Sequence, residues 1–210
     1  MYKGGELSMA DLSPMMKQYF QIKQQNPDTL LFFRLGDFYE LFYDDAKVAS
    51  KELELTLTGR DCGQEERAPM CGVPFHSYES YVARLVSKGY KVAICEQLED
   101  PALAKGLVKR DVIRVITPGT VMESSMLDET RNNFIGSVFV QGIQAGVCFA
   151  DISTGELHAT TLSAKTVENL EQLLKNELAR FSPREILINS SVFDFTGLPV
   201  FIREKLTASL

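Results

Sequence analysis

The sequence is poor in the residues that most often bind metal ions in proteins. Among 210 residues it has two histidines, His76 and His158, and four widely spaced cysteines, with no CxxC or HxxxH pair. A zinc site is therefore not expected. The cysteines have no histidine or carboxylate partner that can be recognised in the sequence. We interpret them as reduced, buried, small apolar side chains.

Long apolar runs and an excess of basic residues are also missing. No stretch approaches the ~20 apolar residues of a membrane span, and the N-terminus lacks the apolar core of a signal peptide, so we expect a cytoplasmic protein without a membrane partner. With 22 Lys and Arg against 28 Asp and Glu, the net charge is −6. The overall electrostatic field of the chain would repel DNA phosphates, so any contact with nucleic acid has to rely on a local group of residues.

The composition and pattern that are present indicate an α/β protein. The chain is 45% hydrophobic, has 14 Gly and 8 Pro, and shows no low-complexity run, which predicts one large or two modest domains. In the first part helices and strands alternate, which favours a mixed sheet covered by helices. We expect helices at 11–26, 38–53 and 77–88, and strands at 29–35, 53–58, 90–95 and 112–116. Ser13 and Ser77 are expected helix caps, Pro14 a first helical residue, and Gly89 a helix end.

The pattern changes after a polar connecting segment at 121–133. Three strands are expected at 134–141, 146–152 and 156–162, then a helix at 166–180 and a strand at 185–189. This βββαβ order is typical of a ribonuclease-H-like fold. The tail at 190–210 has no clear final element, so we expect the second domain to be cut short.

The segment Gly-Asp-Phe-Tyr-Glu-Leu-Phe-Tyr at 36–43 carries the most information. We expect it to turn from a strand into the helix at 38–53, and two interpretations remain open. Asp37 and Glu40 have the spacing of a capping box, which would make their role structural. In the helical projection, however, Phe38 and Glu40 lie away from the apolar stripe. An outward phenylalanine can wedge into a base step, which costs less where pairing is faulty, and a carboxylate can accept a hydrogen bond from a displaced base.

Four motifs carry a resemblance to a known family: GDFYELF at 36–42, PMCGVPFH at 69–76, VAICEQ at 92–97 and RVITPGT at 114–120. In their order and spacing, from about Met9 to the end, the chain resembles the N-terminal part of the MutS family of bacterial DNA mismatch-recognition proteins. The resemblance implies a mismatch-binding domain at 9–122, a linker at 123–133 and a partial ribonuclease-H-like connector domain at 134–210. Residues 1–8 would be a disordered start or a cloning remnant.

The resemblance also implies roles for five residues. Phe38 would stack on the mispaired base and Glu40 would hydrogen-bond to it. Arg60 and Arg110 match positions near the DNA backbone, and Met70 lies near the same surface in the family. For each arginine the alternative is an ordinary solvated surface charge.

Partners and cofactors follow from the same resemblance. Mismatched double-stranded DNA is the expected ligand, and the connector would contact the downstream protein MutL. The ATPase domain, which needs ATP and Mg²⁺, and the homodimer interface would lie beyond residue 210. The chain itself lacks the phosphate-loop pattern GxxxxGK[ST], so we expect no cofactor and no ATPase activity in it.

Other function classes receive less support from the residues. The expected βββαβ portion could be a metal-dependent nuclease, but 134–141 contains no acidic residue, and only Asp151 and Glu156 remain, flanking a turn. The same portion could be a pure interaction module without chemistry. His76 could act as a base, but no nucleophile accompanies it, and its place next to Ser77 favours a role at the start of a helix.

Overall fold

The computed structural model describes residues 12–100, 102–104, 106–123, 126–128, 130–206 and 208–209. The expected start segment at 1–8 lies outside them. The chain forms two compact units. The first contains the described residues up to Leu85 together with Lys91–Ile116, and the second contains Val86–Tyr90 and the described residues from Thr117 onward. No helix among the described residues is both long enough and apolar enough to cross a bilayer.

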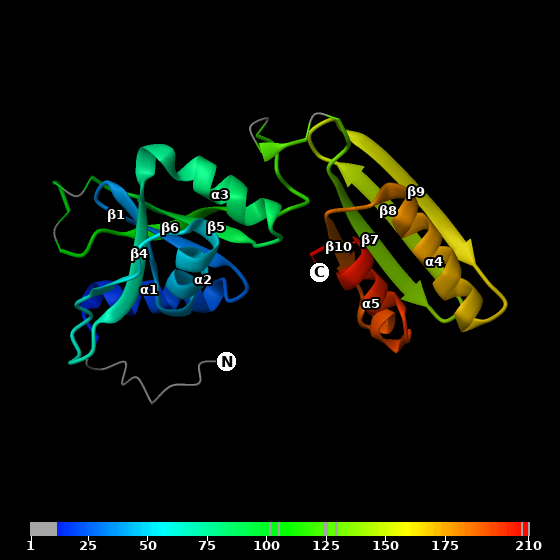
Figure 1. Cartoon of the computed structure of the whole chain (residues 1–210), viewed down its shortest axis with the longest axis horizontal. Coiled ribbons are helices and arrows are strands. Elements are labelled where there is room, and N and C mark those ends of the chain that lie inside the picture. Colours follow the sequence, from blue (N-terminus) through cyan, green and yellow to red (C-terminus); the bar gives the residue numbers. More distant parts are fainter. Residues whose placement is uncertain are drawn as a thin grey trace. The chain divides into compact units, whose positions relative to one another are not determined.

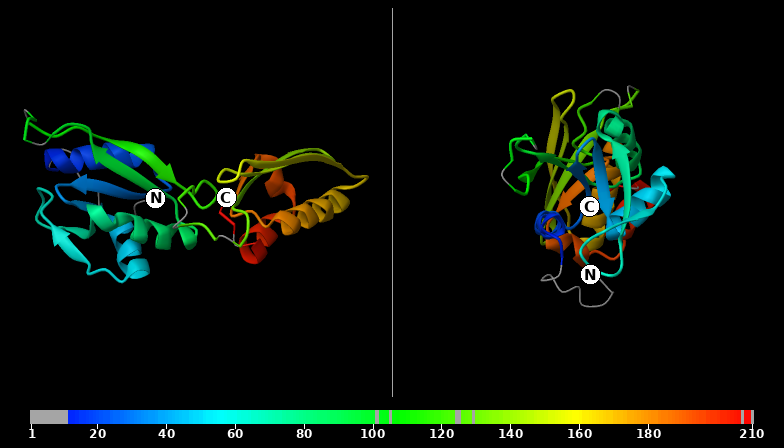
Figure 2. Two further views of the ribbon diagram at one scale, coloured as in Figure 1. Left: turned by 90° about the horizontal axis from the view of Figure 1, so that it is seen from above. Right: turned by 90° about the vertical axis from the view of Figure 1, so that its left-hand side faces the viewer.

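The first unit is a mixed sheet with helices on both faces, as the pattern predicts (Figure 1). Its strand order is β3-β4-β2-β1-β5-β6, with β1 parallel to β5 and antiparallel to β2. Helix α1 covers one face, and α2 and α3 cover the other (Figure 2). The strands are β1 (Leu30–Leu35), β2 (Phe38–Phe42), β3 (Thr58–Arg60), β4 (Ala68–Pro74), β5 (Val92–Gln97) and β6 (Arg110–Ile116). The helices are α1 (Pro14–Gln25), α2 (Tyr43–Leu53) and α3 (Tyr78–Ser87), with a 3₁₀ turn η1 (Phe75–Ser77) before α3.

Local sequence signals set the ends of α1 and α3. The Ser13 side chain accepts a hydrogen bond from the Met16 amide at 3.4 Å, and Pro14 is the first helical residue, which confirms the expected cap. Gly89 follows α3 with a φ of +91°, a conformation that glycine adopts without strain. The apolar face of α1 packs on the sheet and buries Met16, Tyr19 and Ile22 against Leu31, Phe33 and Phe42.

The helix expected at 38–53 is wrong in its first part, because residues 38–42 form strand β2. Gly36, with a φ of +56°, lies in a two-residue turn that places Leu35 opposite Phe38 and closes a hairpin. On its other side β2 pairs with β4. The backbone hydrogen bonds to two neighbouring strands outweigh the helical spacing of the apolar side chains, and α2 begins only at Tyr43.

Two other local expectations are also wrong, and one observed strand has no counterpart among the expected elements. No strand covers 53–58: Leu53 ends α2, Glu54 caps it in the left-handed region at φ +59°, and β3 begins at Thr58. No expected strand covers β4 (Ala68–Pro74). Ser77 does not cap α3; it lies in the 3₁₀ turn, and its hydroxyl donates to the Pro74 carbonyl at 3.3 Å.

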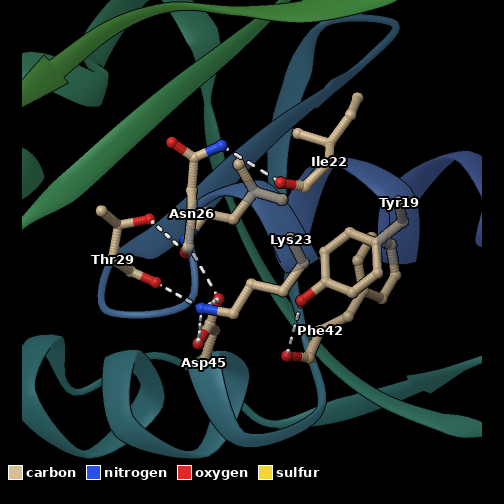
Figure 3. Close-up of polar contacts among 8 residues, drawn as sticks. Tyr19, Ile22, Lys23, Asn26, Thr29, Phe42 and Asp45 are labelled. Atoms are coloured by element: carbon tan, nitrogen blue, oxygen red, sulfur yellow. Dashed lines mark hydrogen bonds and ion pairs between the residues drawn. The ribbon is translucent and has the colours of Figure 1, made fainter.

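A partly buried ion pair joins α1 to α2 next to the start of β1 (Figure 3). Asp45 is 8% exposed, and its two carboxylate oxygens lie 2.9 and 3.0 Å from Lys23 Nζ. The Leu31 amide donates to the same carboxylate at 3.0 Å, and Lys23 also donates to the Thr29 carbonyl. Burial raises the pKa of Asp45, while the Lys23 charge opposes the rise. The pair fixes α1 on the sheet, although nothing in the sequence analysis pointed to it.

The second unit has the expected βββαβ order and agrees with a ribonuclease-H-like architecture. Its sheet order is β10-β7-β8-β9, with β10 parallel to β7 and the other pairs antiparallel. Helix α4 and the short C-terminal helices cover one face of this sheet (Figure 2). The elements are β7 (Phe134–Gln141), β8 (Gln144–Asp151), β9 (Glu156–Ser163), α4 (Val167–Phe181), β10 (Glu185–Ile188), η3 (Ser190–Asp194), α5 (Leu198–Phe201) and η4 (Ile202–Leu206).

The end of the RVITPGT motif packs within the second unit. The Gly119 amide donates to Glu185 Oε2 at 3.1 Å, and the Thr117 hydroxyl donates to the same oxygen. Glu185 is only 5% exposed, and a Cβ on Gly119 would lie 2.8 Å from the Glu185 Cβ. This part of the motif is therefore a structural attachment. The boundaries expected at 122 and 134 for functional domains stay a prediction.

Candidate nucleic-acid interface

The candidate interface lies on the α1 face of β2. Because side chains alternate along a strand, Phe38, Glu40 and Phe42 point to this face and Tyr39 to the other. Helix α1 packs over Phe42, which is fully buried. Phe38, at the far end of the strand, is 47% exposed. The strand therefore presents one aromatic ring beyond the part of the sheet that α1 covers.

Phe38 is held on a rigid support. It pairs with Leu35 of β1 and with Pro74 of β4, and the Phe75 amide donates to the Asp37 carbonyl at 2.9 Å. A ring on a strand that is paired on both sides can enter a ligand with little additional loss of conformational entropy.

Contacts of Tyr39 on the opposite face of the sheet also anchor β2. Tyr39 is buried, and its hydroxyl donates to Glu96. Glu96 also pairs with Arg34 at 3.3 Å, and the Arg34 guanidinium lies 3.9 Å from the centre of the Phe75 ring. Burial, followed by the contact with Glu96, raises the pKa of Tyr39 well above its ordinary value. This network was not recognisable in the sequence, because its members come from four separate segments.

Glu40 does not face solvent as the helical projection indicated. Its side chain is 12% exposed, and its two carboxylate oxygens accept hydrogen bonds from Arg60 Nη1 at 2.6 and 2.5 Å. The capping-box interpretation of Asp37 and Glu40 is wrong as well, since no helix begins there. Strand β4 lies between β2 and β3 and sets the register that brings Arg60 to Glu40.

Gly72 keeps the surface beside Phe38 and Glu40 open. It pairs with Glu40 in β4, and a Cβ at this position would lie 3.3 Å from the Tyr39 carbonyl oxygen, 3.5 Å from Glu40 Cγ and 3.7 Å from Phe38 Cδ1. Gly72 is not among the residues expected at the site. A glycine between apolar residues of one strand is nevertheless a signal of close approach by another group.

Arg110 lies on the same face but is not the freely solvated charge of the alternative interpretation. Its Nε donates to the Arg34 carbonyl at 2.7 Å, and its Nη1 donates to Gln18 Oε1 at 3.0 Å. Its guanidinium lies 5.1 Å from the ring centre of Phe33, the residue that pairs with Glu40. Burial lowers the pKa of Arg110, and the nearby Arg60 charge lowers it further.

Met70 lies deeper on the same face. It is half-buried and packs against the cluster that contains Phe42, while the Thr58 hydroxyl lies 3.7 Å from its sulfur. The structure therefore brings all five residues expected from the family resemblance to one face of one sheet. Their contact with DNA stays a prediction.

The cysteines and His76 do not form a reactive site in the structure. Cys62, Cys71 and Cys95 are buried, and Cys148 is half-buried. Burial raises the pKa of Cys71 to about 11 and that of Cys95 to about 12, which disfavours the nucleophilic thiolate. His76 is exposed in the 3₁₀ turn before α3, consistent with a role at the start of that helix.

Asp151 and Glu156, the two acidic residues considered for a nuclease, have local partners around one turn. Asp151 Oδ1 accepts hydrogen bonds from the Ser153 amide and hydroxyl and from the Thr154 amide, and Oδ2 accepts one from the Asn133 amide. Burial opposes ionisation, but these hydrogen bonds hold the pKa of Asp151 below its ordinary value. Glu156 contacts His158 at 2.6 Å. Within the described parts of the chain, no group of three or more His, Cys, Asp or Glu side chains is arranged to hold a metal ion.

Comparison with known proteins identifies the family. The family described as MutS domain I matches residues 13–125, and the one described as MutS domain II matches residues 133–205. The DNA mismatch repair protein MutS of Acetivibrio thermocellus is 61% identical over 197 residues, which cover 94% of this chain and 22% of the relative. The proteins of the same name from Ruminiclostridium cellulolyticum and Clostridium tetani are 59% and 54% identical, over 94% and 86% of this chain and 22% and 20% of their own lengths.

The chain thus spans about a fifth of the length of these relatives. Within that span, the two family matches follow one another in the order of the two folded units. The chain therefore belongs to the MutS family, of which it contains domains I and II.

Proposed function

We propose that the first unit recognises mispaired or unpaired bases in duplex DNA, with Phe38 as a wedge and Glu40 as a hydrogen-bond acceptor for the displaced base. The observation that carries this proposal is the exposed Phe38 ring, held on a rigid hairpin beside the Glu40 carboxylate. The name of the relatives, DNA mismatch repair protein, supports the same ligand.

The proposed preference for mismatches follows from the energy of DNA deformation. Inserting an apolar ring between base pairs costs a few kcal/mol of unstacking, and the cost is lower where pairing is already faulty. Glu40 can accept a hydrogen bond only from a base N–H that the displacement makes accessible. Arg60 and Arg110 supply positive charge on this face, which offsets the repulsion between the acidic chain and the phosphates.

We further propose that domain II links this recognition to parts of a longer protein. In that protein an ATPase domain would bind ATP and Mg²⁺, two copies would form a homodimer, and the connector would contact MutL in the cytoplasm. The chain described here supplies the DNA-reading and connecting parts and no ATPase chemistry.

The test is the binding of Phe38→Ala to a G·T heteroduplex and to the matched homoduplex at one fixed salt concentration. Loss of stacking, worth ~1–3 kcal/mol per base, is expected to lower the heteroduplex preference by about 5- to 150-fold, within the limit of the wild-type preference. Phe139→Ala is the matched control, because Phe139 is 58% exposed on a strand of the other unit. It should leave the preference unchanged.

Fluorescence anisotropy of labelled duplexes measures both affinities. The 210-residue chain is assayed first. The same residues are then grafted into the Acetivibrio thermocellus relative in place of its matching segment. The graft allows the measurement if the 210-residue chain alone binds DNA too weakly. A folded Phe38→Ala variant that keeps the full preference in both settings would refute the wedge assignment.

A further inference from the structure

The contact between Glu40 and Arg60 indicates a role for Arg60 that differs from binding a phosphate. A single guanidinium nitrogen lies 2.5 and 2.6 Å from both carboxylate oxygens of Glu40. The two residues come from β2 and β3, which are separated by β4, so the pair depends on the register of three strands. The contact is therefore set by the pairing of the sheet.

Charge explains why Glu40 needs this partner. The duplex carries one phosphate charge per ~1.7 Å of its axis, and a carboxylate brought close to it is repelled. The chain as a whole has a net charge of −6, so it supplies no general compensation. Arg60 is the cation in direct contact with the Glu40 carboxylate. A negatively charged hydrogen-bond acceptor beside DNA therefore depends on Arg60.

The geometry leaves room for a base while the pair stays intact. A carboxylate has about four lone-pair sites, and Arg60 Nη1 approaches from one direction only. Gly72, the cross-strand neighbour of Glu40, has no side chain to fill the space toward Phe38. The Arg60 side chain is 37% exposed and that of Glu40 12%, so the arginine lies on the outer side of the pair.

We propose that Arg60 is a positioning residue for Glu40: it neutralises the carboxylate and aims it at the space beside Phe38, and it thereby sets the preference for heteroduplex over homoduplex DNA. This inference rests on the proposed function of Phe38 and Glu40. It differs from the expectation that Arg60 is a contact to the DNA backbone. A phosphate contact weakens binding to every duplex about equally when it is lost and does not depend on Glu40.

The experiment is a double-mutant cycle of Arg60→Gln and Glu40→Gln, with affinities for the G·T heteroduplex and the homoduplex measured for all four proteins. Arg60→Gln is expected to lower the heteroduplex preference by about 5- to 150-fold, the range for losing one well-placed contact to a base. It also leaves the Glu40 charge without its partner, so homoduplex binding should weaken. Adding Glu40→Gln should restore the homoduplex affinity, because the repelled charge is gone.

Arg67→Gln is the matched control for the loss of one positive charge. Arg67 is exposed in the loop that precedes β4, next to the residue that pairs with Arg60. This variant should keep the ratio of the two affinities. Arg60→Lys, which retains the charge, should keep a larger share of the preference than Arg60→Gln and serves if the glutamine variant fails to fold. Each variant is assayed both in the 210-residue chain and in the graft into the Acetivibrio thermocellus relative, as for Phe38→Ala.

Two results would overturn the inference. One is a folded Arg60→Gln variant that binds both duplexes more weakly but keeps their ratio. The other is strict additivity of the Arg60 and Glu40 substitutions. Failure of the proposed function is separately visible, because Phe38→Ala would then keep the preference whatever the Arg60 variants do.

Discussion

Gly119→Ala should destabilise the second unit. We expect a larger loss of stability than from adding a methyl group at any other glycine in the sheet of that unit or in the segment Thr117–Gly119. The added Cβ would lie 2.8 Å from the Glu185 Cβ, 3.0 Å from the Ile135 Cβ and 3.1 Å from Glu185 Oε2. Carbon atoms in contact are normally separated by ~3.5–4.0 Å. The segment from Thr117 to Gly119 must therefore move away from the sheet.

The expected cost combines two effects of this movement. Overpacking of a well-filled site costs about 1–3 kcal/mol. The hydrogen bond from the Gly119 amide to the buried Glu185 carboxylate is lost as well, and leaving a buried group with fewer partners costs about 1–3 kcal/mol. Since one movement relieves the clash and breaks the bond, the two costs overlap. We expect the free energy of unfolding of the second unit to fall by about 2–4 kcal/mol.

Urea denaturation followed by NMR signals of each unit separately measures this change. With a denaturant slope of about 2 kcal/mol/M, the midpoint of the second unit should fall by about 1–2 M while that of the first unit stays constant. Gly146→Ala is the matched control, because a Cβ on Gly146 in β8 has no neighbour within 4 Å. It should leave the second unit unchanged or stabilise it by about 0.5–1 kcal/mol.

Equal midpoints for Gly119→Ala and Gly146→Ala would refute the reasoning. That result would mean that the attachment of the Thr117–Gly119 segment to Glu185 contributes nothing to the stability of the second unit.

Three further predictions concern other contacts. Lys23→Met leaves the buried Asp45 carboxylate without its cation and should destabilise the first unit by about 3 kcal/mol. This value is at the lower end for a broken buried pair, because the Lys23 side chain is 21% exposed. An unchanged urea midpoint of the first unit would contradict the prediction. Gly72→Val fills the space beside Phe38 and should lower the heteroduplex preference while changing homoduplex affinity little. An unchanged ratio of heteroduplex to homoduplex affinity in the anisotropy assay would show that DNA does not use this space. Because hydrogen bonds hold the folded-state pKa of Asp151 below its ordinary value of 3.8, its carboxylate stabilises the second unit above that pH, and the gain disappears as the pH falls through the lowered pKa. The stability difference between wild type and Asp151→Asn should therefore shrink in acid, and a difference that grows would have the wrong sign.

The sequence by itself determined the architecture of the second unit and the first helix. Three strand-like runs separated by glycine-containing turns over 134–162, and the spacing of 166–180, placed three strands and a helix within about two residues of their observed ends. Ser13 and Pro14 marked the start of α1, because capping is a local interaction between residues three apart. The family resemblance also singled out Phe38, Glu40, Arg60, Arg110 and Met70, although not their geometry.

Only the tertiary structure decided what residues 38–42 are and what surrounds them. Their apolar spacing fits a helix, but hydrogen bonds to β1 and β4, which lie elsewhere in the sequence, make them a strand. The same pairing turned Glu40 from an expected solvent-facing residue into the partner of Arg60, and made Gly72 its neighbour. Strand register is set by contacts between distant segments, and a one-residue shift would move Phe38 to the opposite face. No pattern within the segment records that choice, so it appears only when the sheet is assembled.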